Sequence, residues 1–504
     1  MIQKAKNFIA NKCTIKNLLI LFLIVQPIFD LKIFYNSIST LIRVFFVILF
    51  FIYYFIKCNN TKKYFILIYP VLISIYFIFH HFNALNFNSY VPGNFNYSII
   101  QEGLYFIKMI CPYLLIYSLF RSNLSKKDIF FIIKTLVLII SLTIIISNLF
   151  LFSYGSYSDM KIKANIFEWF NLKSTYTYQD LASKGLFEVA NQISAILLMF
   201  LPFTIILALE NKSKSNLITL LCNILGLLLL GTKVAVLGIG IVFVYTSSIY
   251  IFINRKFKNL SVIAIVFALY ICLLPFNPTF LRIAENQEII EASSNPIIYE
   301  DSSSSTNTEE PASNENIEPL PENATTNKKN YVLQHYLANN INENFILNSY
   351  PYEYDVDFWY DIIKSNNPLK ADYRFLEQAM VKRVIEINNN KWDIIFGITY
   401  TRIQNIFNIE KDFIMQYYAL GIIGLIFVFA PYFILLLYWI FRQLYSKLKK
   451  LDLLSLVAFI TICMIFFVAY YSGNLLNSLG FVIYFSIIIH ILLIAVDNNS
   501  VDIQ

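Results

Sequence analysis

Long apolar runs follow one another along the whole chain and alternate with short polar segments. The runs at 130–152 and 186–209 are long enough to cross about 30 Å of hydrocarbon as helices. The full set of runs lies near 18–36, 38–56, 64–80, 99–120, 128–152, 186–209, 216–231, 232–253, 259–275, 413–441, 451–471 and 475–496. This pattern predicts an all-α polytopic membrane protein with about 12 transmembrane helices. Residues 217–252 fit one long helix or two spans, and we favour a division at Gly231-Thr232-Lys233.

Basic residues mark alternate short loops between these spans. The loops carry Lys57, Lys62 and Lys63; Arg121, Lys126 and Lys127; Lys212 and Lys214; Arg255, Lys256 and Lys258; and Arg442, Lys447, Lys449 and Lys450. The short loops on the other side contain almost no Lys or Arg. By the positive-inside rule the basic loops face the cytoplasm. We therefore expect both termini inside and one large loop, at about 276–411, outside.

Composition excludes several other classes of protein. The 504 residues are 57% hydrophobic and only 14% charged, whereas soluble domains carry about 25% charged residues. The net charge of +7 comes mainly from the short loops, so it does not indicate nucleic-acid binding. The six cysteines form no CxxC pair, and the chain has no Walker loop, GxGxxG or HExxH. We therefore expect no cofactor, and neither a zinc site nor a disulfide framework is indicated.

The chain divides into four predicted parts. Residues 1–275 form an N-terminal transmembrane bundle of about nine spans, and residues 413–504 form a C-terminal bundle of three. Residues 276–330 are rich in Ser, Asn, Pro and Glu, which predicts an acidic, disordered part of the outer loop. Residues 331–412, called the cap below, contain tryptophans and a helical pattern, which predict a folded helical domain. In a second outer segment, 153–185, spaced apolar residues suggest a helix lying in the membrane interface.

Cationic side chains occur within or next to the outer halves of several spans, where a charge costs at least about 2.5 kcal/mol. These are Arg43, Lys108, Lys233 and Arg282, and the cap adds Arg374 and Arg383. If they converge, they form a cationic pocket for a lipid-linked phosphate or diphosphate. Alternatively, they snorkel to the interface or pair with acids as structural groups. Arg374 and Arg383 need not share one helix face.

Three side chains are candidates for a general base that activates a sugar hydroxyl. Glu410 and Asp412 stand just before the tenth span, on different helix faces, so we expect only one of them to point into a pocket. Acids at this position are equally explained by stabilisation of a helix N-terminus. His335 is the third candidate, because it is the only histidine in the large loop. Asp355 and Asp357 resemble a metal-binding DxD, but we interpret them as solvated acids.

Several local patterns resemble the superfamily of O-antigen ligases and O-antigen polymerases, which are bacterial polysaccharide membrane proteins. The patterns are Val25-Gln-Pro-Ile-Phe-Asp30 followed by Arg43, Glu188-Val-Ala-Asn-Gln-Ile-Ser194 leading to Pro202, Gly231-Thr-Lys233, Arg374, Ile395-Phe-Gly397, Glu410-Lys-Asp412, Gly421-Ile-Ile-Gly424 and Tyr471-Ser-Gly473-Asn474. Each pattern is short, but together they extend over nearly the whole chain.

The resemblance implies a metal-independent helical glycosyltransferase of the GT-C type in the cytoplasmic (inner) membrane. Such enzymes transfer a glycan from undecaprenyl diphosphate to an acceptor outside that membrane. The resemblance makes Lys233, Arg282 and Arg374 candidates for binding the diphosphate, and makes Glu410 and Asp412 candidates for the base or for the architecture of the site. True ligases have a histidine followed by a glycine-containing pattern. No glycine occurs in 336–351 after His335, which favours a polymerase.

The leading hypothesis is therefore extracytoplasmic polymerisation of undecaprenyl-diphosphate-linked oligosaccharide repeat units in cell-surface polysaccharide synthesis. One alternative is ligase-like transfer of a finished glycan to a lipid or wall acceptor. Another is a flippase or transporter of lipid-linked sugars, although transporters usually consist of two related halves. A non-catalytic scaffold is a further alternative. The expected partners are the lipid-linked glycan, membrane lipid and other polysaccharide-assembly proteins, without nucleic acid.

Overall fold

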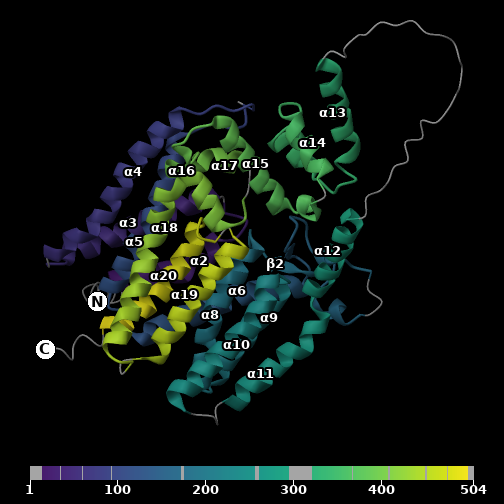
Figure 1. Ribbon diagram of the computed structural model, residues 1–504. Helices are drawn as coiled ribbons and strands as arrows, with labels where there is room; N and C mark the ends of the chain where they lie inside the picture. Colours follow the sequence, from purple (N-terminus) through teal and green to yellow (C-terminus); the bar gives the residue numbers. More distant parts are fainter. Residues whose placement is uncertain are drawn as a thin grey trace, which may run out of the picture.

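The computed structural model describes residues 14–34, 36–59, 61–91, 93–171, 175–255, 260–294, 321–365, 367–406, 409–448, 451–473 and 475–497, and these are almost entirely helical (Figure 1). The α-helices are α2 (Ile15–Phe29), α3 (Asn36–Lys57), α4 (Ile68–Leu85), α5 (Ile99–Arg121), α6 (Lys126–Leu149), α7 (Tyr178–Leu181), α8 (Ala190–Glu210), α9 (Lys214–Leu230), α10 (Lys233–Asn254), α11 (Leu260–Leu273), α12 (Pro278–Ser294), α13 (Pro321–His335), α14 (Val356–Lys364), α15 (Tyr373–Asn388), α16 (Asp393–Phe396), α17 (Tyr400–Ile406), α18 (Asp412–Tyr445), α19 (Leu453–Tyr471) and α20 (Leu479–Asp497). Short 3-10 or π turns stand at Thr61–Leu67, Ile166–Phe170, Leu274–Phe276, Asn344–Ser349 and Pro368–Ala371.

Each of the apolar runs corresponds to a helix. Within the described ranges, nine helices are long and apolar enough to cross a membrane, and three shorter apolar helices accompany them, at Ile15–Phe29, Lys214–Leu230 and Leu479–Ile494. The prediction of an all-α polytopic membrane protein is confirmed. The predicted division at 231–233 is also present, because α9 ends at Leu230 and Gly231 adopts a left-handed conformation. Thr232 then begins α10 by accepting the backbone N–H of Ala235 at 3.1 Å.

Helix α8 lies in the interior of the bundle, where it packs on α6, α9, α10, α11, α19 and α20. Of its most apolar stretch, 89% is buried inside the protein, whereas only 17% is buried in the span Lys63–Leu85. Both spans are hydrophobic on all sides. Because protein covers α8, we assign it to the bundle core, and we assign the apolar exposed sides of the Lys63–Leu85 span to lipid.

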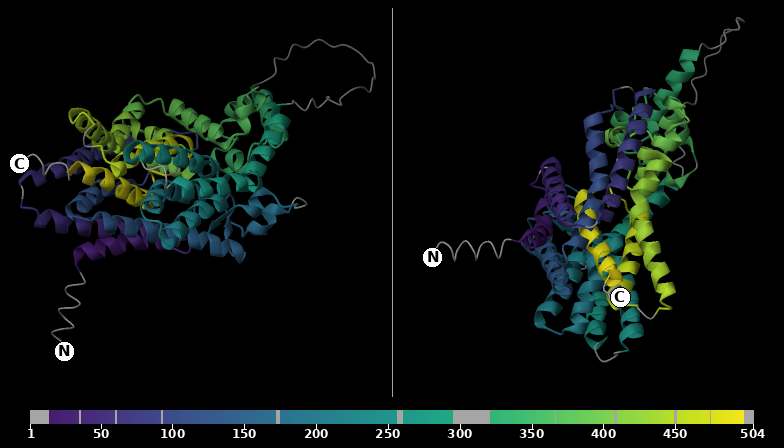
Figure 2. Two further views of the ribbon diagram at one scale, coloured as in Figure 1. Left: turned by 90° about the horizontal axis from the view of Figure 1, so that it is seen from below. Right: turned by 90° about the vertical axis from the view of Figure 1, so that its left-hand side faces the viewer.

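The cap helices gather at one end of the bundle, the upper end in Figure 1, and the right-hand view of Figure 2, which keeps the same vertical direction, agrees with this arrangement. They are joined to α4 and α5 by a buried polar contact. The carboxylate of Glu102 accepts the backbone N–H groups of Tyr400 and Thr401 at 3.0 and 2.9 Å. It also lies 3.0 Å from Nε2 of His80. A buried carboxylate is stable only when it is hydrogen-bonded in this way, so the contact ties the cap to the two spans.

Two glycines allow the cap to approach α18 at backbone distance. Gly421 interrupts α18 with a φ of 65°, and Gly397 follows α16 with a φ of 78°. A Cβ atom on Gly421 would lie 2.4 Å from the backbone of Ile395, and one on Gly397 would lie 2.2 Å from the carbonyl oxygen of Ala419. Both positions therefore exclude any side chain. The two glycine-containing patterns of the sequence, at 395–397 and 421–424, are the two sides of this contact.

The segment 153–185 differs from our expectation of an interfacial helix. Its described residues form a small antiparallel pair of strands, β1 (Tyr154–Gly155) and β2 (Ser183–Gly185), with the short helix α7 and one 3-10 turn. Ile162 and Trp169 are buried. These two residues pack into the protein from irregular backbone, because tertiary burial outweighs a weak local periodicity, whereas Phe167 and Phe170 stay exposed.

The predicted acidic segment 276–330 is helical where the structure describes it beyond the turn at Leu274–Phe276. Helix α12 occupies its first part as far as Ser294, and α13 begins at Pro321. Residues 295–320 lie outside the described residues, so the prediction for that stretch stays a prediction. In Figure 1, α12 leads from the bundle towards the cap end, and α13 stands beside α14 there.

Candidate functional site

Three of the predicted cationic side chains come together at the cap end of the bundle. Lys233 is the first residue of α10, Arg282 belongs to α12 and Arg374 to the first turn of α15. Arg282 and Arg374 are close enough for their charges to repel that of Lys233. We call these three side chains the cationic cluster. Because cations repel one another, such a cluster is favourable only when an anion shares it.

Arg282 is fixed by an aromatic ring that the sequence did not single out. Its guanidinium lies 3.8 Å from the ring centroid of Tyr157, which is within cation–π distance. The hydroxyl of Tyr157 in turn donates a hydrogen bond to the carbonyl oxygen of Gly231 at 2.9 Å. The Nε of Arg282 is buried and has no hydrogen-bond partner among the described residues. The ring thus holds Arg282 beside the turn that carries Lys233 and leaves a donor available.

Glu410 is the acid of this site. Its carboxylate accepts hydrogen bonds from Nε of Arg374, at 2.8 Å, and from Nη2 of the same side chain. Both side chains are a little over one-third exposed, at 37% for Arg374 and 36% for Glu410. Behind Glu410 stands Gly473, where a Cβ atom would lie only 0.6 Å from the Glu410 carbonyl oxygen. Gly473 therefore lets the loop before α18 press against the end of α19.

Glu377 is a second acid at the site, and the sequence analysis did not identify it. It is 6% exposed and lies close to both Glu410 and Arg374. Burial, reinforced by the nearby Glu410 carboxylate, raises the pKa of the Glu377 carboxyl to about 8. A usable signal existed, since Glu377 follows Arg374 by three residues in a helical pattern, and residues at this spacing share a face. No comparable pattern pointed to Tyr157.

Asp412 and His335 each have partners outside the cationic cluster. Oδ2 of Asp412 accepts the backbone N–H groups of Leu475 and Leu476 at 2.9 and 3.1 Å, and its side chain is fully buried. Asp412 thus fixes the loop between α19 and α20. His335 stacks on Tyr331 with ring centroids 4.0 Å apart, and its Nδ1 lies 2.8 Å from the Tyr331 carbonyl oxygen. The expectation that only one of the two acids points into a pocket stays a prediction.

Arg43 and Arg383 are engaged in ion pairs elsewhere. Arg43 lies inside the bundle, where it pairs with Asp30 at 2.6 Å and donates to Oε1 of Gln26 at 2.8 Å. Arg383 lies in the cap and binds both oxygens of Asp355, at 2.7 and 3.2 Å. For these two residues the geometry agrees with the structural alternative, in which a costly charge is neutralised by a neighbouring acid.

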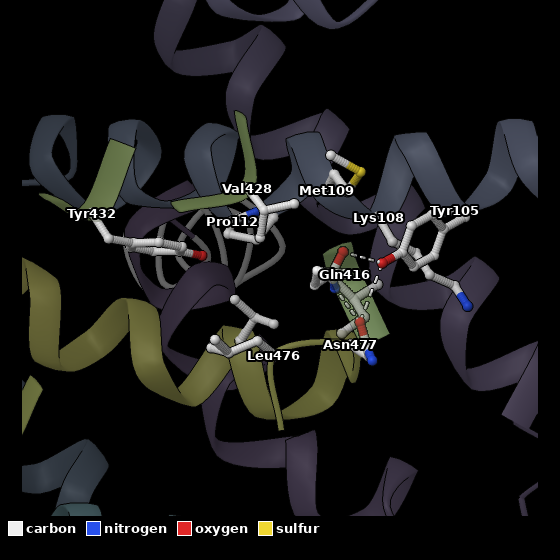
Figure 3. A pocket seen from close by; sticks show the side chains of 11 residues that line it. Tyr105, Lys108, Met109, Pro112, Gln416, Val428, Tyr432, Leu476 and Asn477 are labelled. Carbon is white, nitrogen blue, oxygen red and sulfur yellow. Dashed lines mark hydrogen bonds between the residues drawn. The ribbon is translucent and has the colours of Figure 1, made fainter. Parts of the chain in front are cut away.

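Lys108 lines a separate pocket between α5, α18 and the start of α20 (Figure 3). Beside it, the hydroxyl of Tyr105 donates to Oε1 of Gln416 at 2.7 Å and to Oδ1 of Asn477 at 3.2 Å. The remaining walls are mostly apolar, with Met109 and Tyr432 among them. The structure therefore does not bring Lys108 together with the cationic cluster.

The described residues of the site are rich in cationic groups. In the described ranges, no three or more His, Cys, Asp or Glu side chains gather closely enough to hold a metal ion. The cluster presents three positive charges, while Glu410 supplies one carboxylate and Glu377 is mostly neutral below pH 8. A multiply charged anion such as a diphosphate fits this excess of positive charge, and arginines suit phosphate oxygens because they can bind two at once.

The comparisons with known proteins agree with this architecture. A family model described as "O-antigen ligase like membrane protein" matches residues 12–499. Searches of curated proteins and of solved structures give no match. Because the family match extends over nearly the whole chain, the protein belongs to the O-antigen ligase-like membrane protein family.

Proposed function

We propose that the protein polymerises undecaprenyl-diphosphate-linked oligosaccharide repeat units outside the cytoplasmic membrane, in cell-surface polysaccharide synthesis. The family supports glycan transfer or polymerisation in general. The observation that carries the proposal is the meeting of Lys233, Arg282 and Arg374 beside Glu410, at the end of the bundle that the cap covers. Three cations next to one acid suit a reaction with an anionic leaving group and a proton to be removed.

In the proposed reaction, the acceptor hydroxyl oxygen attacks the anomeric carbon of the donor sugar. The bond from that carbon to the diphosphate oxygen breaks, and the lipid diphosphate leaves with the electron pair. The cationic cluster stabilises the charge that develops on the leaving group. The acceptor proton passes to Glu410, which is the base that this proposal favours over Asp412 and His335. Glu410 becomes available for the proton when the diphosphate takes its place on Arg374.

Polymerisation is preferred to the transfer of a finished glycan because His335 lacks the following glycine pattern and stacks on Tyr331. The flippase alternative is less well supported. A transporter site is expected near the membrane midplane between related halves, whereas the cluster lies at one end of an asymmetric chain. The polymerase, the ligase and the flippase each predict a different product, so one experiment separates them.

The test is glycan chain length in cells that carry Arg374→Ala or Glu410→Ala at equal protein level. Lys382→Ala is the matched control, because Lys382 is an exposed cation on the same helix α15. Single repeat units that accumulate on their carrier outside the membrane support the polymerase. Full-length glycan that remains on its carrier indicates a ligase, and units trapped inside indicate a flippase. Unchanged glycan in both variants removes the site assignment.

A further inference from the structure

Lys108 differs in its surroundings from two other cationic side chains that stand well inside spans. Arg43 on α3 pairs with Asp30 at 2.6 Å, and Lys134 on α6 donates to Oδ1 of Asn216 at 3.0 Å. Within the described ranges, Lys108 on α5 takes part in no ion pair and no hydrogen bond. A charge inside a span is costly unless a neighbouring group compensates it. The position of Lys108 therefore suits an anion that comes from outside the protein.

The pocket beside Lys108 is polar at one end and apolar at the other (Figure 3). The three helices that form it, α5, α18 and α20, all begin at the cap end, where Glu102 and Asp412 fix their first turns and loops. The lining residues nearest these beginnings are Tyr105, Lys108, Gln416 and Asn477, and those farther along the helices include Pro112, Val428, Tyr432 and Val482. The lining thus changes from polar to apolar with depth.

The polar end has hydrogen-bond donors to spare. The Tyr105 hydroxyl donates to Oε1 of Gln416 at 2.7 Å, and the Gln416 amide donates to Oδ1 of Asn477, so the side-chain oxygens of this end accept from one another. A carboxamide nitrogen has two N–H groups and a lysine ammonium has three. Among the described residues, one N–H of Gln416 and all those of Lys108 have no acceptor. An anion would supply the missing acceptors.

The pocket adjoins the loop between α19 and α20, which also touches the candidate site. Asn477 lines the pocket, and Gly473, four residues earlier, lies against the carbonyl oxygen of Glu410. The pocket is therefore a neighbour of the site but is separate from the cationic cluster.

We propose that this pocket is a second anion site, which binds the phosphate group of a lipid through Lys108 and the amide of Gln416. The apolar end receives the first part of the lipid chain, which a soluble anion lacks. Two classes of lipid have this chemistry, a polyprenyl phosphate carrier and an anionic glycerophospholipid. The inference goes beyond the proposed function, because binding a lipid at Lys108 requires no glycan transfer.

The test compares matched variants of the full-length protein, purified in a maltoside detergent that contains no phosphate. Lys108→Met removes the charge and keeps an unbranched side chain. Arg121→Met is the control, because Arg121 is an exposed cation at the other end of α5. Each is made alone and together with Arg374→Ala, which weakens the cationic cluster. Removing an uncompensated charge from a span should not lower the unfolding midpoint, so Lys108→Met is expected to stay folded.

The measurement is binding of undecaprenyl phosphate and of phosphatidylglycerol by native mass spectrometry, with inorganic phosphate as a competitor. We expect Lys108→Met to weaken binding of at least one of the two lipids by about tenfold or more, as for the loss of a hydrogen bond from a charged donor. The loss should be the same with and without Arg374→Ala. Arg121→Met is expected to bind like wild type.

The lipid that depends on Lys108 identifies the source, and either lipid supports the inference. Equal affinities of Lys108→Met and wild type for both lipids overturn it. Inorganic phosphate that competes as tightly as the lipids bind also overturns it, because the apolar end would then contribute nothing. Binding that Arg374→Ala alone abolishes would leave no second site, although the proposed function would stand. Unchanged glycan in Arg374→Ala and Glu410→Ala cells would remove the site assignment of the proposed function without touching Lys108-dependent binding.

Discussion

Two arginine–carboxylate pairs show how differently the same chemistry is used in this protein. The Arg43–Asp30 pair lies inside the bundle, with side chains only 5% and 8% exposed. Asp30 also accepts the hydroxyl of Tyr484 at 2.7 Å, so its charge is shared between two donors. The Arg374–Glu410 pair lies at the cap end, with more than one-third of each side chain exposed, and two further cations stand beside it.

The difference lies in the balance of charge around each pair. Arg43 and Asp30 neutralise each other within a closed, hydrogen-bonded group, which leaves no charge for a ligand. Around Arg374 the positive charge exceeds the negative charge, and the pair can open to water. A charge in a membrane protein is costly, so its presence identifies a residue with a specific role. Whether that role is a structural pair or a binding site depends on whether neighbouring groups of opposite charge neutralise it fully.

The enclosed pair is expected to give the largest effect on stability. Arg43→Ala leaves the Asp30 carboxylate buried without its cation, which costs about 3–5 kcal/mol. The measurement is the thermal unfolding midpoint of purified protein in detergent. Lys57→Ala, at the exposed end of the same helix α3, is the control. A variant as stable as the control would mean that Arg43 is free to bind a ligand after all.

The Arg383–Asp355 pair in the cap is intermediate, since Asp355 is only 3% exposed but Arg383 is 33% exposed. Arg383→Ala is expected to cost about 1–3 kcal/mol, because Asp355 keeps the hydroxyl of Tyr350 as one remaining donor. Urea unfolding and limited proteolysis of the cap measure this loss. Glycan chain length should be unchanged at equal folded amount. Accumulation of single lipid-linked repeat units in this variant would instead support a role of Arg383 in binding the diphosphate.

The role of the buried acid Glu377 can be tested through the pH dependence of stability. Burial raises its pKa from 4.5 to about 8, so the folded protein keeps a proton that the unfolded chain loses above pH 4.5. Stability is therefore lost progressively as the pH rises from about 4.5 to about 8. Glu377→Gln removes this loss, so the unfolding free energy of the variant relative to wild type is expected to rise by about 3–4 kcal/mol between pH 5 and pH 8. Unfolding midpoints at both pH values measure it, and a gain independent of pH would contradict the assignment.

The open pair is expected to give the smallest effect on stability. Arg374→Ala should change the free energy of unfolding by less than about 1 kcal/mol, because exposed ion pairs contribute little. The same unfolding measurement applies, with Lys382→Ala as the control. A loss as large as that of Arg43→Ala would show that the pair is structural, and the comparison between the two pairs would then fail.

Most of the fold was predictable, because a membrane demands long apolar runs and each run became a helix. The turn at 231–233 was predictable from its glycine and its lysine. The segment 153–185 was not, since Ile162 and Trp169 pack against partners distant in sequence. In the site, the resemblance and the depth of the charges pointed to Lys233, Arg282 and Arg374. The cation–π contact of Tyr157 depends on tertiary placement alone, so no local pattern indicated it.

The carboxylate of Glu102 has a consequence for how the chain is made. Its backbone partner Tyr400 is separated from it by 298 residues, so α4 and α5 enter the membrane long before that N–H exists. Domains generally form from the N-terminus during synthesis. Here the Glu102 carboxylate on α5 lacks two of its hydrogen-bond donors until α17 has been translated. Chains that terminate earlier, even with nine spans inserted, would expose this defect to membrane quality control. The hydrogen bonds of Glu102 with the cap thus form only after most of the helices have been made.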